Sequence, residues 1–220
     1  MITHPNDLPK ISYEEFKEIN YDLIVPLDMK IDIPEFLEQI EPYRKDFRRW
    51  GEKRSKYPRY GISLKNLDGR IDSELDPACY PLDQWWALYP DKMYWDHDFK
   101  VETELMNLPC MRALEPVREH MIRSSILRWD YSGHLVPHVD IKKDYITHFR
   151  LWGTNTDDNA YSLLYGNQVI TDFEPGRLYM IDTTETHSAI ALDDDVYTFF
   201  IALDLTAKDT LISPSNPKFP

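Results

Sequence analysis

The chain has 220 residues, of which 42% are hydrophobic and 29% charged, so it is long and apolar enough for a sizeable core and is not intrinsically disordered. Its 25 basic and 38 acidic residues give a net charge of −13. A surface this negative repels phosphate backbones, so we expect no nucleic-acid partner. A small cationic pocket inside such a protein remains compatible with this charge.

The sequence carries no targeting or membrane signal that we can identify. No basic segment followed by an apolar one opens the chain, and no run of about 18 apolar residues occurs, so we expect neither a signal peptide nor a membrane partner. Cys79 and Cys110 form no Cys-x-x-Cys pair. We therefore expect reduced thiols in a cytoplasmic protein, with a single disulfide as the alternative. The oligomeric state is not predictable.

Residues 1–123 are predicted to form a helical and loop-rich part. After a polar tail, Ser12 and Glu15 have the spacing of a capping box that begins a helix. A second helix is expected from Ile33, with Pro34 early in it. Its apolar residues recur at helical spacing: Phe36, Leu37, Ile40, Tyr43 and Phe47. The mixed charges of residues 44–49 are interpreted as the solvated face of this helix.

The remainder of this first part has little periodicity. Residues 51–100 are rich in Tyr, Trp, Pro and Asp, which indicates long loops and short helices packed on the main sheet. Aromatic loops of this kind more often plug a core than line a pocket; if this protein binds a substrate, residues 80–96 are expected at the entrance of its pocket. Residues 111–123 are predicted to form a helix that packs Leu114, Val117 and Met121.

From about residue 124 the pattern changes to short strands divided by turn signals. The predicted strands are 126–131, 145–152, 163–165, 168–173, 178–181 and 196–205. Short strands at this spacing without helices between them indicate a mainly β fold, a jelly roll, over residues 124–205. The helical part would pack on it, residues 206–220 would form a C-terminal tail, and residues 1–220 would form a single domain.

One tripeptide offers a candidate metal site. His138 and Asp140 lie two residues apart next to a predicted strand, where alternation places both side chains on one face. His187 lies before the closing strand and can supply a second imidazole. Two imidazoles and a carboxylate are the ligands of an iron site that leaves positions open for a co-substrate and O₂. With 7 histidines, however, a His-x-Asp is expected about once by chance, so a loop His, a turn-forming Asp and a strand-end His remain the alternative.

The flanks of this tripeptide resemble a known family. The similar segments are Gly133-x-His-x-x-Pro-His138, the strand His148-Phe149-Arg150-Leu151-Trp152 and the stretch from His187 to Leu205. They look like the aspartyl/asparaginyl β-hydroxylases, which are Fe(II)- and 2-oxoglutarate-dependent oxygenases on a double-stranded β-helix. The likeness covers residues 124–205. It implies that His138, Asp140 and His187 bind Fe(II), and that free amino acids or peptidyl side chains are hydroxylated with 2-oxoglutarate and O₂ as co-substrates.

Two departures from the family pattern affect the site. Animal members have Gly in place of Asp140, whereas a carboxylate here resembles bacterial amino-acid hydroxylases of the same fold. About ten residues after the distal His the family carries an Arg that pairs with the distal carboxylate of 2-oxoglutarate, and this chain has Tyr197.

Another cation is then needed, because an unpaired buried carboxylate is costly. Arg150, on one strand face with His148, is the first candidate, because its guanidinium can bind a carboxylate with two hydrogen bonds. An outward-facing Arg150 is the alternative; Arg128 and then Arg177 follow as candidates.

Two other classes remain open from the sequence. One is a cupin-like jelly roll that binds a metal or small ligand without oxidative turnover, and the other is an interaction domain without a metal. If the protein is an oxygenase, its expected partner is a small-molecule or peptide substrate.

Overall fold

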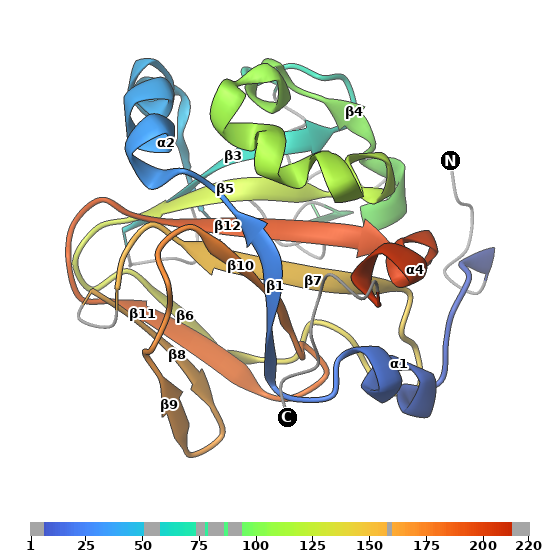
Figure 1. The fold of residues 1–220 in the computed structure, drawn as a ribbon. Coiled ribbons are helices and arrows are strands. Elements are labelled where there is room, and N and C mark those ends of the chain that lie inside the picture. The colour runs from blue at the N-terminus through green and yellow to red at the C-terminus, as the bar shows by residue number, and fades with distance from the viewer. Residues whose placement is uncertain are drawn as a thin grey trace.

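Two antiparallel sheets form the body of the molecule, which we describe from a computed structural model covering residues 7–50, 58–73, 78, 86–87, 94–157 and 160–212 (Figure 1). The eight-stranded sheet has the order β1-β10-β7-β12-β5-β3-β2, with β4 paired to β3. The four-stranded sheet has the order β6-β11-β8-β9. This arrangement is the double-stranded β-helix, or jelly roll, so the predicted fold class is confirmed.

The strands are unevenly long, and β12 runs through the middle of the larger sheet. Their bounds are β1 Ile24–Lys30, β2 Arg48–Arg49, β3 Arg59–Asn66, β4 Val101–Glu102, β5 Ser124–Trp129, β6 His134–His138, β7 His148–Thr154, β8 Tyr161–Tyr165, β9 Gln168–Ile170, β10 Arg177–Ile181, β11 His187–Ala191 and β12 Val196–Asp204. The strands predicted after residue 124 are confirmed within a few residues at each end.

The helices are short and lie mostly against one face of the larger sheet, with α2 and η6 on the side away from the four-stranded sheet (Figure 1). Their bounds are α1 Tyr13–Ile19, α2 Ile33–Ile40, η2 Glu41–Asp46, η4 Asp96–Asp98, η5 Glu104–Asn107, η6 Pro109–His120, η7 Leu205–Ala207 and α4 Lys208–Leu211, where η marks a 3-10 helix. In the described ranges, none of them combines the length and apolar character needed to cross a bilayer.

Strand alternation divides the interior into two apolar cores. On β7, Phe149 and Leu151 pack towards the helices, whereas Trp152 lies in the core between the two sheets. On β12, Phe199 and Ile201 also belong to the helix-facing core. Residues that alternate with these therefore face the space between the sheets, which we call the inner face of the large sheet.

The starts of the first two predicted helices are correct, but the second and third helices differ from the prediction. Ser12 and Glu15 exchange the two hydrogen bonds of a capping box. The helix that begins at Ile33 ends at Ile40, and the chain continues as a 3-10 helix. The predicted helix over 111–123 is also a run of 3-10 turns, η6, rather than an α-helix. It contains Pro116, and proline has no N–H to donate to an α-helical ladder. Its predicted core residues Leu114, Val117 and Met121 are buried.

The N-terminal half contributes strands that were not predicted. β1 forms one edge of the large sheet, and β3 pairs along β5. Arg48 and Arg49, expected on a solvated helix face, form β2 and pair with β3. β3 was not predicted because its sequence does not alternate clearly between apolar and polar residues: it contains Gly61 and the buried polar Lys65. Of the two cysteines, Cys110 is a buried free thiol, and Cys79 lies outside the described residues.

Candidate metal centre

The register of the small sheet brings two histidines side by side. His138 is the last residue of β6 and His187 the first of β11, and the two are direct cross-strand partners. Opposite residues of an antiparallel pair have their Cβ atoms about 4.5–5.5 Å apart, so their side chains meet on one face. The two imidazole centroids lie 4.4 Å apart. Strand pairing therefore explains why residues far apart in the sequence meet.

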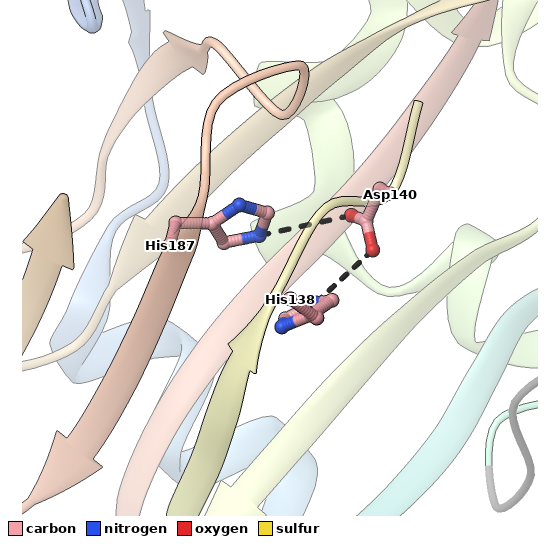
Figure 2. Close-up of side chains that lie close together, drawn as sticks. All are labelled: His138, Asp140 and His187. Atoms are coloured by element: carbon pink, nitrogen blue, oxygen red, sulfur yellow. Dashed lines mark ion pairs between the residues drawn. The ribbon is translucent and has the colours of Figure 1, made fainter. Parts of the chain in front are cut away.

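Asp140 completes the cluster two residues beyond β6 (Figure 2). Its Oδ1 lies 3.1 Å from Nε2 of His138, and its Oδ2 lies 3.9 Å from Nε2 of His187. The possible ligand atoms of the three residues all lie within 4.8 Å of one another. Ligand atoms about 2.0–2.2 Å from one ion lie roughly 3–3.5 Å apart, so small side-chain adjustments are enough to bind a transition metal.

Backbone contacts orient each part of the cluster. Nδ1 of His138 donates to the carbonyl of Val136 at 2.8 Å, and Nδ1 of His187 donates to that of Glu185 at 3.0 Å. Each Nε2 then keeps a lone pair that could bind a metal ion, as metal-binding histidines require. The backbone N–H of Asp140 donates to the carbonyl of Thr183 at 3.1 Å, which fixes the segment that carries the carboxylate.

The charges suit a cation. Burial raises the pKa of Asp140, but the hydrogen bond to His138 and the charge of Arg150 outweigh it and hold that pKa well below its ordinary value. Burial lowers the pKa of His187. For His138 burial acts in the same direction, yet the hydrogen bond to Asp140 outweighs it and raises the pKa. At neutral pH the cluster thus offers an ionised carboxylate, and its nitrogen and oxygen donors favour Fe(II), Mn or Zn over Ca or Mg.

Metal affinity should fall on acidification with a slope of one proton. His138 has the raised pKa, whereas the lowered pKa values of Asp140 and His187 keep those groups unprotonated to lower pH. Below the pKa of His138, we expect the Co(II) dissociation constant to rise about tenfold per pH unit, because one proton competes for Nε2. Calorimetric Co(II) titrations from about pH 5 to 8 measure it. A constant affinity over that range contradicts the prediction.

Arg150 lies on the inner face of β7, in phase with Trp152, and its side chain is 5% exposed. Its Nη2 donates to Oδ2 of Asp96 at 3.3 Å, and its guanidinium lies 4.5 Å from the ring centroid of Phe200. Nε and Nη1 are buried and have no hydrogen-bond partner among the described residues. Arg150 also depresses the pKa of Asp140, so its charge acts on the cluster.

His148 and Asp96 surround Arg150. Nε2 of His148 is 3.7 Å from Oδ2 of Asp96 and has no hydrogen-bond partner in the described part of the chain. Burial lowers the pKa of His148 to about 3, so it is a neutral imidazole. Asp96 also pairs with Arg123 at 3.3 Å. Sequence reasoning missed Asp96, because only the fold brings residue 96 beside β7.

Tyr197 stands in place of the family's arginine, and its phenol was a candidate hydrogen-bond donor to the co-substrate, as Arg128 was a candidate cation; both lie on the other face of the large sheet. Tyr197 packs in the helix-facing core, with its ring 5.4 Å from that of Phe36. Arg128 lies over the ring of Tyr60 at 4.6 Å. Both alternate with inner-face residues of their strands, so the expectation that they contact the co-substrate is corrected.

Two further candidates are accounted for in other ways. Arg177 contacts Glu174 and donates to the carbonyl of Leu27 at 3.0 Å, which is a structural role at the turn before β10. Most of the predicted aromatic entrance at residues 80–96 lies outside the described residues. Within the part that is described, the indole N–H of Trp86 donates to the carbonyl of Tyr94 at 2.8 Å, and its ring packs edge-on against Trp95.

Comparison with known proteins adds no family assignment. No family model and no curated protein matches the sequence. Among solved structures, a prolyl hydroxylase from Trichoplax adhaerens, in complex with a hypoxia inducible factor peptide fragment, is 11% identical with a TM-score of 0.45, over 91% of this chain and 94% of that one. A Pseudomonas putida prolyl-4-hydroxylase is 10% identical with a TM-score of 0.45, over 87% and 97%. A 2OG-Fe(II) oxygenase family oxidoreductase from Burkholderia pseudomallei is 10% identical with a TM-score of 0.43, over 89% and 92%.

Proposed function

We propose that the protein is an Fe(II)- and 2-oxoglutarate-dependent oxygenase that hydroxylates an amino-acid or peptidyl side chain. The observation that carries this proposal is the convergence of His138, Asp140 and His187, with both Nδ1 atoms held by backbone carbonyls. Three protein ligands on one side of an ion leave its remaining positions open for small molecules. A purely structural metal site would instead be closed by a fourth protein ligand.

The residues fit the proposed metal in charge and in donor type. When bound, Fe(II) with 2-oxoglutarate and O₂ supplies the oxidant for C–H hydroxylation, with decarboxylation of 2-oxoglutarate to succinate. His138, Asp140 and His187 would hold the ion, and the ionised carboxylate offsets one of its two positive charges. The backbone hydrogen bonds to Val136 and Glu185 keep both Nε2 atoms oriented while ligands exchange.

Arg150 supports the use of a dicarboxylate co-substrate. Nε and Nη1 of its buried guanidinium have no hydrogen-bond partner among the described residues. They lie on different edges of the group, so a carboxylate would accept from one of them and take its second hydrogen bond from the remaining N–H of Nη2. Asp96 pairs with Arg123 as well as with Arg150. A distal carboxylate of 2-oxoglutarate would accept a hydrogen bond from Arg150, and the neutral His148 beside it adds a further possible hydrogen bond.

Tyr165 offers a neutral donor on the same side. Its ring centroid lies 5.6 Å from that of His187, and its buried hydroxyl has no hydrogen-bond partner in the described ranges. Burial raises the pKa of Tyr165, so the phenol keeps its proton. An orphaned buried hydroxyl is costly, and a ligand oxygen would satisfy it.

The experiment that tests the proposal is O₂-dependent succinate formation. The protein is loaded with Fe(II) and 2-oxoglutarate without oxygen and then exposed to O₂, in the presence of a panel of free amino acids and short peptides. Succinate above the level without Fe(II), together with a hydroxylated panel member, supports the oxygenase. Tight metal binding without succinate would instead favour a cupin-like binding protein.

Tyr197→Phe should leave the KM for 2-oxoglutarate within about twofold of the original value. The Tyr197 side chain packs against the rings of Phe36 and Phe47 in the helix-facing core, on the other side of the sheet from the metal centre. The measurement is the dependence of succinate formation on 2-oxoglutarate concentration. A rise in KM of tenfold or more would mean that the phenol contacts the co-substrate after all.

A further inference from the structure

A second buried arginine, Arg59, lies on the inner face of the large sheet, and the proposed oxygenase chemistry does not use it. It is the first residue of β3 and pairs with Trp129 of β5. The neighbouring Tyr60 packs with the helix-facing core, so alternation directs Arg59 to the opposite, inner face. Its guanidinium lies 4.6 Å from the ring centroid of Trp50 and 5.1 Å from that of Trp129.

The charge of Arg59 is buried and forms no ion pair with a described residue. Its exposed fraction is 5%, and its Nε has no hydrogen-bond partner. No carboxylate within the described ranges lies close enough to form an ion pair with it, whereas Arg150, Arg123 and Arg118 each have one. Burial lowers the pKa of Arg59 to about 10, so it remains positively charged at neutral pH. An unpaired buried charge is costly, which indicates a site that is completed by a ligand.

Arg59 acts on the metal centre from the side of β3. The carboxylate of Asp140 raises the pKa of Arg59, and the positive charge of Arg59 lowers the pKa of His138. Tyr161 of the small sheet packs its ring 5.6 Å from that of Trp129, so the arginine stands where the two sheets face each other. Arg150 approaches the centre from β7, two strands beyond β5 in the large sheet. The inner face therefore carries two separate cations near one metal centre.

We propose that Arg59 binds a carboxylate of the substrate, so that the hydroxylated compound is an acid held by its carboxylate between β3 and the metal centre. This inference rests on the proposed function, in which Arg150 takes the co-substrate. Indole faces beside the guanidinium leave its edge for a planar anion, which suits a carboxylate and its two oxygens. A single cation suits a monoanion better than a phosphate dianion. Since the whole protein has a net charge of −13, an acidic substrate needs such a local cation.

The binding experiment uses acetate as the probe and acetamide as its neutral counterpart, because both are small enough to reach a confined site. Metal-free protein labelled with ¹⁵N at its indoles is titrated with each compound, and the resonances of Trp50 and Trp129 are assigned by Trp→Phe variants. We expect acetate to shift these two resonances with at least about tenfold higher affinity than acetamide. Arg59→Met should abolish the difference. Equal responses to the two compounds, or an unchanged response in Arg59→Met, would overturn the proposal.

Arg128→Met is the matched control. Arg128 also lies over an aromatic ring, but on the helix-facing side and 3.9 Å from Asp130. The Arg128→Met variant should leave the response of the two indole resonances to acetate unchanged. Arg59→Met should also raise the unfolding midpoint by about 2–4 °C, since it removes an unpaired buried charge, whereas Arg128→Met should not. A fall in the midpoint of Arg59→Met would mean that the arginine is a structural residue, and would overturn the assignment.

The two proposals can fail separately. If Co(II) does not bind at His138, Asp140 and His187, the oxygenase fails while acetate still reports on Arg59 in the metal-free protein. In the loaded protein, Arg59→Met should leave the dissociation constant of 2-oxoglutarate within about twofold. If Arg59→Met weakens the binding of 2-oxoglutarate as strongly as a substitution of Arg150 does, Arg59 binds the co-substrate, and the assignment of Arg59 to the substrate is wrong.

Discussion

His187→Ala should raise the dissociation constant of Co(II) by about 100-fold or more. The His187 side chain is 3% exposed and supplies one of three convergent ligand atoms, with its ring fixed by the carbonyl of Glu185. Loss of an outer hydrogen-bond partner alone costs about 10–100-fold in metal affinity, and loss of the ligand itself costs at least as much. Anaerobic calorimetry with Co(II), or its visible absorption spectrum, measures the change.

His134→Ala is the control for this variant. His134 lies at the start of β6 and pairs with Ile190 of β11, so it shares both strands with the metal ligands but lies outside their cluster. We expect its metal affinity to match that of the original protein. Unchanged Co(II) affinity in His187→Ala would contradict the assignment of the metal centre, and an equal loss in His134→Ala would point to a general disturbance of the small sheet.

The clustering of His138, Asp140 and His187 was predictable because these residue types and their spacing are visible in the sequence. His138 and Asp140 stand two apart beside a strand, and His187 stands before the closing strand. The sequence does not contain the register that pairs His138 with His187, which depends on how β6 and β11 align. One residue of slippage would turn a histidine to the other face of the sheet. The resemblance to a family therefore carried information that alternation alone lacks.

The same dependence on strand alternation explains why Tyr197 does not face the metal centre, contrary to the expectation from the family spacing. The family spacing places an arginine about ten residues after the distal histidine, but in this chain that position is in phase with Phe199 and Ile201, which fill the helix-facing core. Its neighbour Thr198 lies on the inner face, where its hydroxyl accepts a hydrogen bond from the indole of Trp129 at 2.9 Å. A cation at the site therefore has to come from another strand.

Arg59 and Asp96 were beyond prediction for a different reason. Both lie in the N-terminal half, where an irregular sequence hides strands such as β3, and both act on the site only because β3 pairs along β5 and residue 96 lies beside β7. Long-range contacts of this kind leave no periodic signal. The direction of Arg150, by contrast, follows from alternation once Phe149 and Leu151 are assigned to the helix-facing core.

Arg150→Gln should raise the dissociation constant of 2-oxoglutarate by about 100-fold in the Co(II)-loaded protein. Removing one partner of a buried hydrogen-bonded charge pair costs about 2–5 kcal/mol of binding free energy. Gln can still donate to Asp96, which keeps Arg123 as its cation, so the neighbouring structure retains its contacts. Arg150→Lys should recover only part of the loss, because an ammonium lacks the planar fork of a guanidinium.

A co-substrate without the distal carboxylate separates binding from folding in this variant. We expect 2-oxopentanoate, which keeps the 2-oxo acid that reaches the metal but ends in a methyl group, to bind the original protein and Arg150→Gln with affinities within about threefold. The 100-fold loss should then appear for 2-oxoglutarate alone, because only its distal carboxylate meets Arg150. If the binding of both compounds is weakened equally, Arg150 stabilises the structure of the site through its contact with Asp96, and another residue binds the distal carboxylate of 2-oxoglutarate.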